Sequence, residues 1–387
     1  MTPTNFIYLD NAATTFPKPP EVIQAAADFY MTKGVNPGRT GFDLALEAEE
    51  MIANCRKELC GFFGGTEPNR LVFGHNVTDA LNHVIDSTLQ EGDHAITTYL
   101  EHNSVIRPLH NAETKRGVEV DWVPFDENGY VDPAAIGNLI KDNTKLVVCT
   151  HGSNVIGTVQ PVAEIGRICR EKGVLLAVDC AQTAGMIPID VAAMNIDILC
   201  FTGHKSLMAP PGSGGMYVAE HVDVWPSRSG GTGVKSALKT HVKQYPWRFE
   251  FGTLNLLGVA GLYEGQKWIA ARGGIEAIYA HEMELASRLK DGMAAIDGVE
   301  FYCADLSRDH LPVFAWNLGD MPAGQAGTIL DVDHDVICRT GLHCAPMVHE
   351  GIGTFDRDGT CRFSVGAYTT ADEVDRAIAA VRDLATM

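Results

Sequence analysis

A lysine and an aspartate follow two apolar runs that have the character of buried strands. Lys205 comes shortly after the run 196–201, and Asp179 comes directly after the run 173–178. Neighbouring parallel strands bring the residues at their carboxyl ends to one edge of a sheet, so these two side chains are expected to meet. A lysine in a confined pocket loses solvation and becomes a neutral amine that can form a Schiff base. The alternative is a surface lysine beside an ordinary strand-end carboxylate.

An aspartate facing such a lysine is the partner that a protonated pyridine nitrogen requires, as in pyridoxal 5'-phosphate. The phosphate of this cofactor needs a strand-to-helix turn that is rich in backbone amides. The turn after Phe73 is of this kind, because Gly74 and Asn76 tolerate unusual dihedral angles and Thr78 places a hydroxyl at the helix start. Thr202 and His204, beside the lysine, are close enough in sequence to reach the same phosphate.

Further polar residues follow strand-like runs and are candidates to contact the cofactor ring. His102 follows the run 94–98; it could stack on the ring and move protons, since the unperturbed pKa of histidine is about 6.5. The alternative is a histidine that caps a helix. Asn154 and Gln182 are candidate hydrogen-bond donors to the phenolic oxygen of the cofactor.

An amino-acid substrate would need an arginine that holds its carboxylate at two points. Arg362 is flanked by strand-like residues and is therefore the first candidate, with Arg339 and Arg248 as competitors and a structural arginine as the alternative. Cys344 lies between Gly341 and Pro346, in a segment predicted to be exposed and mobile. Exposure and a nearby histidine favour thiolate chemistry, whereas the alternative is a surface cysteine without a role.

Composition narrows the class of protein. The chain has 387 residues, with a formal net charge of −19, which argues against a nucleic-acid or acidic-membrane surface. The segment 1–10 lacks the pattern of a signal peptide, and no run approaches the roughly 18 apolar residues of a membrane helix. The ten cysteines are scattered without a Cys-x-x-Cys pair. This pattern predicts reduced thiols in the cytoplasm and no metal site.

Alternating strand and helix patterns between residues 70 and 220 predict an α/β fold with a largely parallel sheet covered on both faces. The strands are expected at 71–73, 94–98, 118–123, 145–150, 174–178, 196–201 and 214–218, and helices at 77–89 and 161–172. Proline is expected at the first position of the second helix. The glycine-rich stretch within 226–253 predicts a long functional loop.

The carboxyl-terminal part predicts a smaller domain of antiparallel strands with helices on one side. Helices are expected at 256–272, 275–296 and 370–385, the last with a capping box, and strands at 299–302, 312–317, 336–339 and 361–365. The domain division predicted from these patterns is a large domain over 15–255 and a small domain formed by 1–14 and 256–387.

Several motifs, in order along nearly the whole chain, carry a resemblance to a known family. They are residues 8–15 (YLDNAATT), Glu101-His102, residues 153–158 (SNVIGT), 178–182 (VDCAQ), 203–205 (GHK), 249–253 (FEFGT), 339–346 (RTGLHCAP) and 361–364 (CRFS). The chain resembles the cysteine desulfurases of the class V aminotransferases, more narrowly the group related to selenocysteine lyases. The resemblance implies fold type I of the pyridoxal-phosphate enzymes, with a seven-stranded sheet in the large domain.

The resemblance also implies a role for each matching residue. The implied catalytic residues are Lys205 as the Schiff-base lysine, His102 as the stacking acid–base group and Cys344 as the nucleophile that takes sulfur. Arg362 and Asn154 would bind the substrate. The implied cofactor contacts are Asp179 at the pyridine nitrogen, Gln182 and Asn154 as polar partners, and Asn76, Val77, Thr78, Thr202 and His204 at the phosphate, joined by Thr253 from the neighbouring subunit of a homodimer.

The activity implied by this resemblance converts L-cysteine to L-alanine and leaves a persulfide on Cys344 for a sulfur-acceptor protein, as in iron–sulfur cluster assembly. Asn103 and Leu342 stand where many relatives carry histidines, which leaves the choice between cysteine and selenocysteine open. The alternatives are a selenocysteine lyase or another class V aminotransferase or lyase that does not use Cys344, and a binding protein for sulfur relay or regulation without turnover.

Overall fold

A computed structural model describes residues 6–37 and 42–387 of the protein. The fold is centred on a seven-stranded sheet. Its strands are β2 (Leu71–Gly74), β3 (His94–Thr98), β4 (Glu119–Val123), β5 (Thr144–Thr150), β6 (Leu175–Asp179), β7 (Ile198–Thr202) and β8 (Gly214–Val218). They lie in the order β2-β8-β7-β6-β5-β3-β4. The pairs among β3 to β7 are parallel, whereas β8 is antiparallel to both β7 and β2. The predicted α/β fold with a mostly parallel sheet is confirmed.

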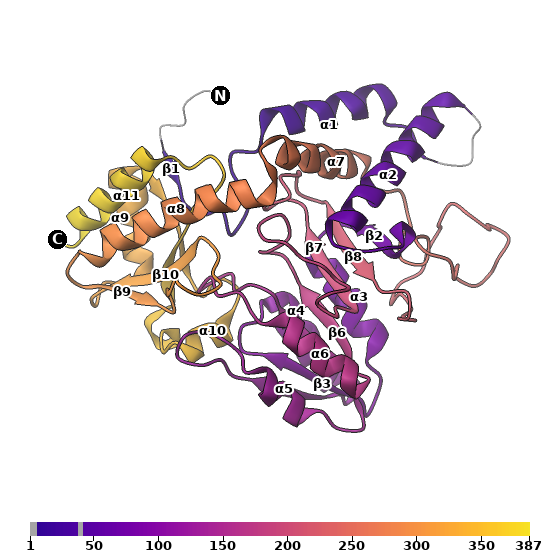
Figure 1. Ribbon diagram of the computed structural model, residues 1–387, viewed down its shortest axis with the longest axis horizontal. Coiled ribbons are helices and arrows are strands. Elements are labelled where there is room, and N and C mark those ends of the chain that lie inside the picture. The colour runs from indigo at the N-terminus through magenta and orange to yellow at the C-terminus, as the bar shows by residue number, and fades with distance from the viewer. Residues whose placement is uncertain (1–5, 38–41) are drawn as a thin grey trace.

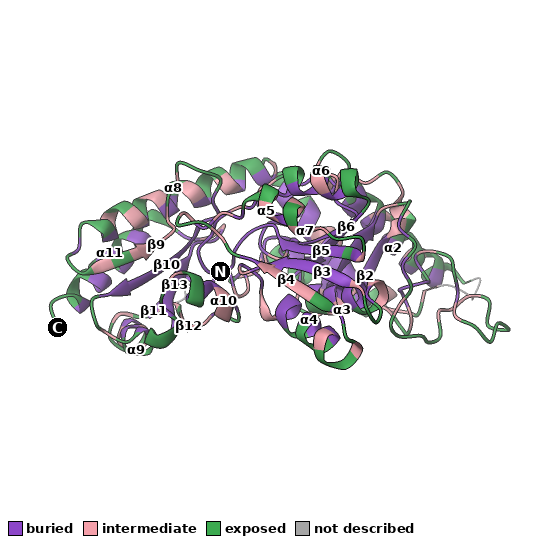
Figure 2. Cartoon of the chain, turned by 90° about the horizontal axis from the view of Figure 1, so that it is seen from below, coloured by how far each residue is buried: buried purple, intermediate pink, exposed green. Residues whose placement is uncertain are grey.

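Helices cover this sheet on both faces (Figures 1 and 2). They are α1 (Pro20–Lys33), α2 (Asp43–Phe62), α3 (Val77–Thr88), α4 (Asn103–Arg116), α5 (Pro133–Leu139), α6 (Val162–Lys172) and α7 (Leu256–Ala271), with a short 3-10 turn, η1 (Pro68–Arg70). The predicted helix at 161–172 begins one residue later than expected, because Pro161 is its N-cap and not its first residue. The strands β3, β5, β7 and β8 carry almost only buried residues, as expected for a sheet that is covered twice.

A second sheet of four antiparallel strands lies beside the first. Its order is β12-β13-β10-β9, formed by β9 (Val299–Tyr302), β10 (Val313–Leu318), β12 (Arg339–Gly341) and β13 (Thr360–Ser364). The accompanying helices are α8 (Gly274–Ala294), α9 (Ala323–His334), α10 (Pro346–Gly351) and α11 (Ala371–Leu384), with the 3-10 turn η2 (Phe355–Arg357). The capping box predicted for the last helix is present, since Thr370 and Glu373 bond reciprocally.

The strand predicted at 336–339 is wrong as a single element. The chain changes partner within it, so that β11 (Val336–Ile337) pairs in parallel with β1 (Ile7–Tyr8), whereas β12 pairs with β13. Cys338 separates the two short strands. This change of partner brings the amino-terminal segment of the chain against the carboxyl-terminal sheet, which a local pattern could not indicate.

Three large apolar clusters support the two sheets: two lie on opposite faces of the seven-stranded sheet, and one lies against the four-stranded sheet. The larger core, on one face of the seven-stranded sheet, includes residues of α7 and the first part of α8, and the core of the four-stranded sheet includes Leu285 and later residues of α8 together with residues of α9 and α11. Helix α8 therefore runs from one core to the other, and Figure 1 shows it extending from beside α7 to beside α11. The division into domains at residue 255 stays a prediction. Among the described residues, no helix has the length and apolar character needed to cross a membrane.

The predicted long loop is present between β8 and α7, where residues 219–255 form no helix or strand (Figure 1). A buried ion pair attaches it to the body of the protein. The guanidinium of Arg56 donates to both carboxylate oxygens of Glu250 at 2.6 and 2.9 Å. Glu250 also accepts a bond of 2.8 Å from the backbone N–H of Phe73. The pair therefore links α2, β2 and the loop segment that leads to Thr253.

Candidate active site

Asp179 and Lys205 lie at one edge of the sheet, as predicted. Asp179 is the last residue of β6, and Lys205 lies three residues beyond the end of the adjacent strand β7. Asp179 is 3% exposed and accepts a bond of 2.9 Å from the N–H of Ala181. Burial lowers the pKa of Lys205 to about 8, opposed by the attraction of Asp179. The amine therefore loses its proton far more easily than an exposed lysine does.

The turn between β2 and α3 has the position expected of a phosphate site, but its backbone differs from the prediction. Asn76 is extended, with φ of −176°, and its side chain caps α3 by accepting the N–H of Asp79 at 2.9 Å. Neither Asn76 nor Gly74 has a left-handed conformation. Gly214 is the glycine that the turn requires, because a Cβ atom there would lie 2.9 Å from the Cα atom of Asn76. The first N–H groups of α3, from Val77 onward, have no acceptor within the helix.

Thr202 and His204 flank the path from β7 to the lysine. The Thr202 hydroxyl is buried and has no hydrogen-bond partner in the described part of the chain. His204 is held by the amino-terminal segment: its Nδ1 lies 3.1 Å from the Thr14 hydroxyl, and its carbonyl accepts the Lys18 ammonium. Burial, together with the charges of Lys205 and Lys18, lowers the pKa of His204 to about 4, so its ring is neutral.

His102 is the N-cap of α4, as the capping alternative proposed. Its Nδ1 accepts the backbone N–H of Ser104 at 3.1 Å and lies 2.8 Å from the Ser104 hydroxyl, which in turn lies 2.7 Å from the Thr78 hydroxyl. Burial, with Lys205 as a further cause, lowers the pKa of His102 to about 4. In the neutral ring this capping bond leaves the proton on Nε2, which makes Nε2 a donor. Ser104 was missed by the sequence analysis.

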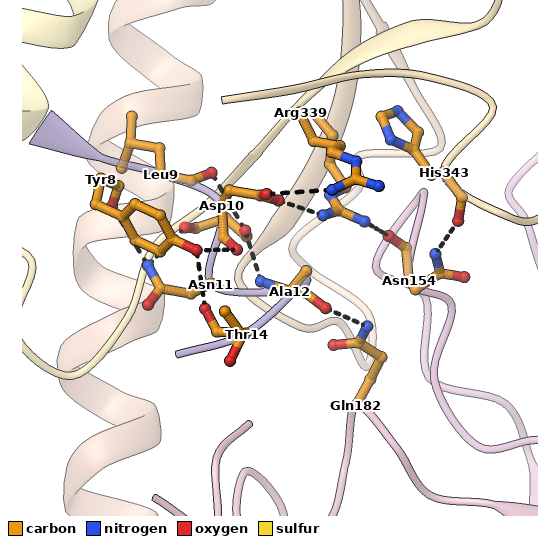
Figure 3. Close-up of polar contacts among 12 residues, drawn as sticks. Tyr8, Leu9, Asp10, Asn11, Ala12, Thr14, Asn154, Gln182, Arg339 and His343 are labelled. Atoms are coloured by element: carbon orange, nitrogen blue, oxygen red, sulfur yellow. Dashed lines mark hydrogen bonds and ion pairs between the residues drawn. The ribbon is translucent and has the colours of Figure 1, made fainter. Parts of the chain in front are cut away.

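Arg362 is buried on β13 and is positioned by two long-range contacts. One Nη atom donates to the carboxylate of Asp10, and the other donates to the Asn154 carbonyl at 2.9 Å. Its Nε has no partner among residues 6–37 and 42–387. Nε and the second hydrogen of each Nη thus stay available for a carboxylate. Arg339 is half exposed and lies 4.0 Å from Asp10 (Figure 3).

Asp10 was missed by the sequence analysis, although it lies in one of the motifs. It is brought to Arg362 because β1 pairs with β11 and Asp10 then forms an isolated bridge with Ser364. Two further predicted residues, Gln182 and Asn154, form hydrogen bonds beside Asp10, as Figure 3 shows. The Gln182 amide donates to the Ala12 carbonyl at 2.9 Å, and the Asn154 amide donates to the His343 carbonyl at 2.8 Å.

Cys344 is exposed, as predicted, and it lies between β12 and α10. Both His343 and Cys344 have left-handed backbones, with φ of 48° and 57°. The prediction that the adjacent histidine favours the thiolate is wrong. His343 is buried, and its Nε2 lies 3.1 Å from the Thr360 carbonyl. Burial keeps the pKa of His343 well below the usual value. The Cys344 carbonyl accepts the N–H of Asn103 at 2.7 Å. The thiol segment is therefore attached beside His102.

Two predicted residues lie away from this group. Thr253 is exposed on the long loop and lines a cavity of about 210 Å³ that includes Gly74 and Asp79 but neither Thr202 nor His204. Arg248, one of the competing arginines, is bound within the same loop to Asp223. Arg248 is thus excluded as the partner of a substrate at the lysine.

The residues that meet at this edge fit pyridoxal 5'-phosphate. The fit rests on a lysine amine with a lowered pKa, the buried Asp179 carboxylate, and the unpartnered Thr202 hydroxyl near the start of α3. These are the groups that would hold its aldehyde, its ring nitrogen and its phosphate. Among the described residues, no group of three or more histidine, cysteine, aspartate or glutamate side chains is placed to hold a metal ion.

Comparison with known proteins agrees with this chemistry. The family model of the class-V aminotransferases matches residues 7–377. A probable cysteine desulfurase of Methanothermobacter thermautotrophicus is 33% identical over 373 residues, which cover 95% of this chain and 92% of that protein. A cysteine desulfurase of Cronobacter sakazakii is 32% identical over 381 residues, which cover 96% of this chain and 91% of that protein.

Solved structures show the same likeness at the level of the fold. The apo structure of a cysteine desulfurase from Thermococcus onnurineus superposes with a TM-score of 0.92 at 30% identity, covering 98% of this chain and 95% of that chain. A cysteine desulfurase from Escherichia coli superposes with a TM-score of 0.87 at 26% identity, covering 98% and 94%. The similarity therefore includes both sheets and the segment that carries the exposed cysteine.

Proposed function

The chain belongs to the class-V aminotransferase family, and from this premise we propose that it is a pyridoxal 5'-phosphate-dependent cysteine desulfurase. The substrate is L-cysteine and the products are L-alanine and a persulfide on Cys344. The observation that supports this best is the attachment of the Cys344 segment to the lysine edge, through the bond from Asn103 and the electrostatic interaction of Cys344 with Lys205. An exposed thiol beside a lysine of lowered pKa matches the needs of sulfur abstraction.

The cofactor, when bound, supplies an electron sink for the carbanion at the substrate α-carbon. Side chains of the protein would attach the cofactor and move the protons. The Lys205 amine would be the attachment point for the cofactor and the base that takes the α-proton. Asp179 would hold the ring nitrogen in its protonated form. His102 presents an N–H at Nε2, so it acts as a hydrogen-bond or proton donor rather than as a base.

Substrate binding and sulfur transfer use the residues of the smaller sheet. The free N–H groups of Arg362 hold the substrate carboxylate, while Asp10 and Asn154 keep the guanidinium in place. The Cys344 thiolate attacks the substrate sulfur: a new S–S bond forms, the substrate C–S bond breaks, and its electron pair stays on the substrate β-carbon. Protonation of that carbon, and return of a proton from Lys205 to the α-carbon, then give alanine.

A homodimeric state and a cytoplasmic location are also proposed. We infer a homodimer in which Thr253 contacts the phosphate of the partner subunit, since Thr253 is exposed and lies apart from Thr202 and His204. Exposed apolar side chains on α1 and near the start of α2, among them Met31 and Leu46, suit such an interface. All ten cysteines are unpaired, which fits the cytoplasm. Sedimentation of the purified chain as a monomer would contradict the dimer.

The persulfide is passed to an acceptor, for which the exposed position of Cys344 leaves access. We propose that this acceptor is a protein, such as one that serves iron–sulfur cluster assembly. Incubating the persulfide-loaded chain with candidate acceptor proteins, and following where labelled sulfur moves, measures the transfer directly.

Replacement of Cys344 by serine tests the function. Cys344→Ser should lose persulfide formation and lower alanine formation by about 10²-fold or more, because the nucleophile is absent. The yellow absorbance of the bound cofactor should persist. Cys303→Ser is the matched control, because Cys303 is a half-buried cysteine that directly follows β9. This substitution should leave persulfide formation, alanine formation and the cofactor absorbance unchanged.

The assay is run with cysteine and selenocysteine side by side, with alanine, sulfide or selenide, and protein-bound persulfide measured in each. Unchanged alanine release from cysteine in Cys344→Ser would exclude a desulfurase and favour a lyase that releases sulfide directly. Release of alanine from selenocysteine alone would identify a selenocysteine lyase.

A further inference from the structure

Glu101, which precedes His102, is a carboxyl group buried behind the lysine edge. Its side chain is completely buried, three residues beyond the end of β3. One oxygen, Oε1, accepts the Thr98 hydroxyl at 2.7 Å and the backbone N–H of Thr150 at 2.9 Å. The other oxygen, Oε2, is buried without any hydrogen-bond partner in residues 6–37 and 42–387. The two oxygens therefore have unequal surroundings.

This pattern of contacts is that of a neutral carboxylic acid. An acid has one carbonyl oxygen, which accepts hydrogen bonds, and one hydroxyl, which donates; Oε1 makes the contacts of the first. An ionised carboxylate would instead leave a bare negative charge on Oε2 in a dry site, which is costly without a cation. Among residues 6–37 and 42–387, the groups that interact with Glu101 electrostatically are Asp179 and the Cys149 thiol, and neither is a cation.

Asp179 is the second carboxyl group of this region. Glu101 bonds to Thr150, the last residue of β5, and Thr150 pairs directly with Asp179 at the end of β6. Two carboxyl groups that interact in a dry site do not both ionise readily. Burial raises the pKa of Asp179, whereas the bond from the Ala181 N–H and the charge of Lys205 lower it and so favour its charged form. Burial, helped by the charge of Asp179, raises the pKa of Glu101 to about 8.

We propose that Glu101 is a positioning residue that keeps its proton and so leaves Asp179 as the single negative charge under the cofactor ring. Its action on the cofactor passes through Asp179 and rests on the proposed function, whereas its own protonation does not. When Glu101 ionises in alkaline solution, the second charge increases the proton affinity of Asp179 and of the ring nitrogen bound to it. The absorbance of the bound cofactor should therefore show an alkaline transition that belongs to Glu101.

Glu101→Gln is the informative variant, because an amide keeps the carbonyl acceptor for Thr98 and Thr150 and cannot ionise. In the full-length chain without cofactor, infrared spectroscopy should show the stretching band of a protonated carboxyl group at neutral pH. The intensity of this band should fall in Glu101→Gln by the contribution of one carboxyl group. If the variant loses no such band, Glu101 is ionised and the proposal is wrong, whatever the enzyme does.

The effect on the cofactor is measured by titrating the absorbance of the loaded enzyme. The alkaline transition of the wild type should be absent from Glu101→Gln; the same transition in both proteins would overturn the coupling to Asp179. Glu282→Gln is the matched control. Glu282 is similarly buried, with an oxygen that has no partner among the described residues, but it lies on α8 and burial alone raises its pKa to about 8, without a contribution from Asp179.

Both glutamine variants should change the pH dependence of stability in the same way. A carboxyl group whose pKa is raised by folding costs nothing below the unfolded pKa of about 4.5, and the cost grows as pH rises to about 8. The melting temperature of each variant should therefore rise above that of the wild type across this window. Only Glu101→Gln should alter the absorbance transition, which separates positioning of Asp179 from a purely structural role.

Discussion

The lysine edge and the Cys344 segment take part in one proposed reaction but are built in opposite ways. The lysine edge is formed by strand ends in the middle of the sheet, with Asp179 buried and the lysine pKa lowered by burial. The Cys344 segment is a short bend of the smaller sheet, with an exposed thiol and two consecutive left-handed residues. Burial adjusts protonation in the first region, and exposure gives access to a second molecule in the other.

The contrast shows how the two regions divide the chemistry. Proton transfer benefits from a dry site, in which small changes in surroundings shift pKa values. Transfer of sulfur to an acceptor protein requires a thiol that reaches the surface. The bond from Asn103 to the Cys344 carbonyl links the two regions at one point. Substitutions in each region should therefore have separable effects.

Lys205→Ala should have the largest effect. Without the amine, the cofactor has no covalent attachment and the α-proton has no base, so turnover should fall by at least about 10²–10⁴-fold. Borohydride reduction followed by peptide mapping should find the cofactor on Lys205 in the wild type and on no peptide in the variant. Lys18→Arg, which changes another lysine with a pKa lowered to about 8, should keep the attachment. Normal steady-state rates in Lys205→Ala would remove the lysine edge from the mechanism.

Arg362→Lys should weaken substrate binding more than it slows chemistry. A lysine keeps the charge but cannot contact Asp10, the Asn154 carbonyl and a carboxylate together. The KM for cysteine should rise about 10- to 100-fold with a smaller change in kcat. Arg339→Lys is the comparison, since Arg339 is half exposed and should have a smaller effect on KM. A larger rise in KM for Arg339→Lys would move the carboxylate site to the competing arginine.

Burial of Lys205 should also be visible in the stability of the cofactor-free chain. The folded pKa of about 8 lies below the ordinary value of 10.5, so folding releases a proton between these values. The cost of burying the charge is therefore fully present below pH 8 and disappears as pH rises to 10.5. Lys205→Met should be more stable than the wild type at neutral pH by at most about 3 kcal/mol, with a difference that shrinks in alkaline solution. Denaturant unfolding at several pH values measures this difference; one that is constant with pH would contradict the lowered pKa.

Much of the large sheet could be predicted from the sequence. The strands ending at Asp179 and before Lys205 are short apolar runs, which the structure places within a residue or two of the predicted bounds. The helices α1 and α2 were not predicted, although they support the larger core. The strand at 336–339 was misread because the change of partner at Cys338 depends on β1, more than 300 residues away.

The candidate site divides in the same way. His102, Thr202 and Arg362 follow or occupy strand-like runs, so their positions could be predicted. Ser104 and Asp10 could not, because their roles come from side-chain contacts: Ser104 bonds to His102 and Thr78, and Asp10 bonds to an arginine 352 positions away. His343 was misjudged because closeness in sequence to Cys344 does not fix the direction of its ring.

The sequence by itself determined which chemical groups are present and which of them stand at strand ends, since apolar runs and their boundaries are local properties. The tertiary structure alone decided their environment. It placed Asp10 against Arg362, turned His343 towards Thr360, left Cys344 exposed and enclosed Glu101 within reach of the charge of Asp179. The physical reason is that burial and long-range pairing set pKa values and hydrogen bonds, and both depend on segments that lie far apart in the chain.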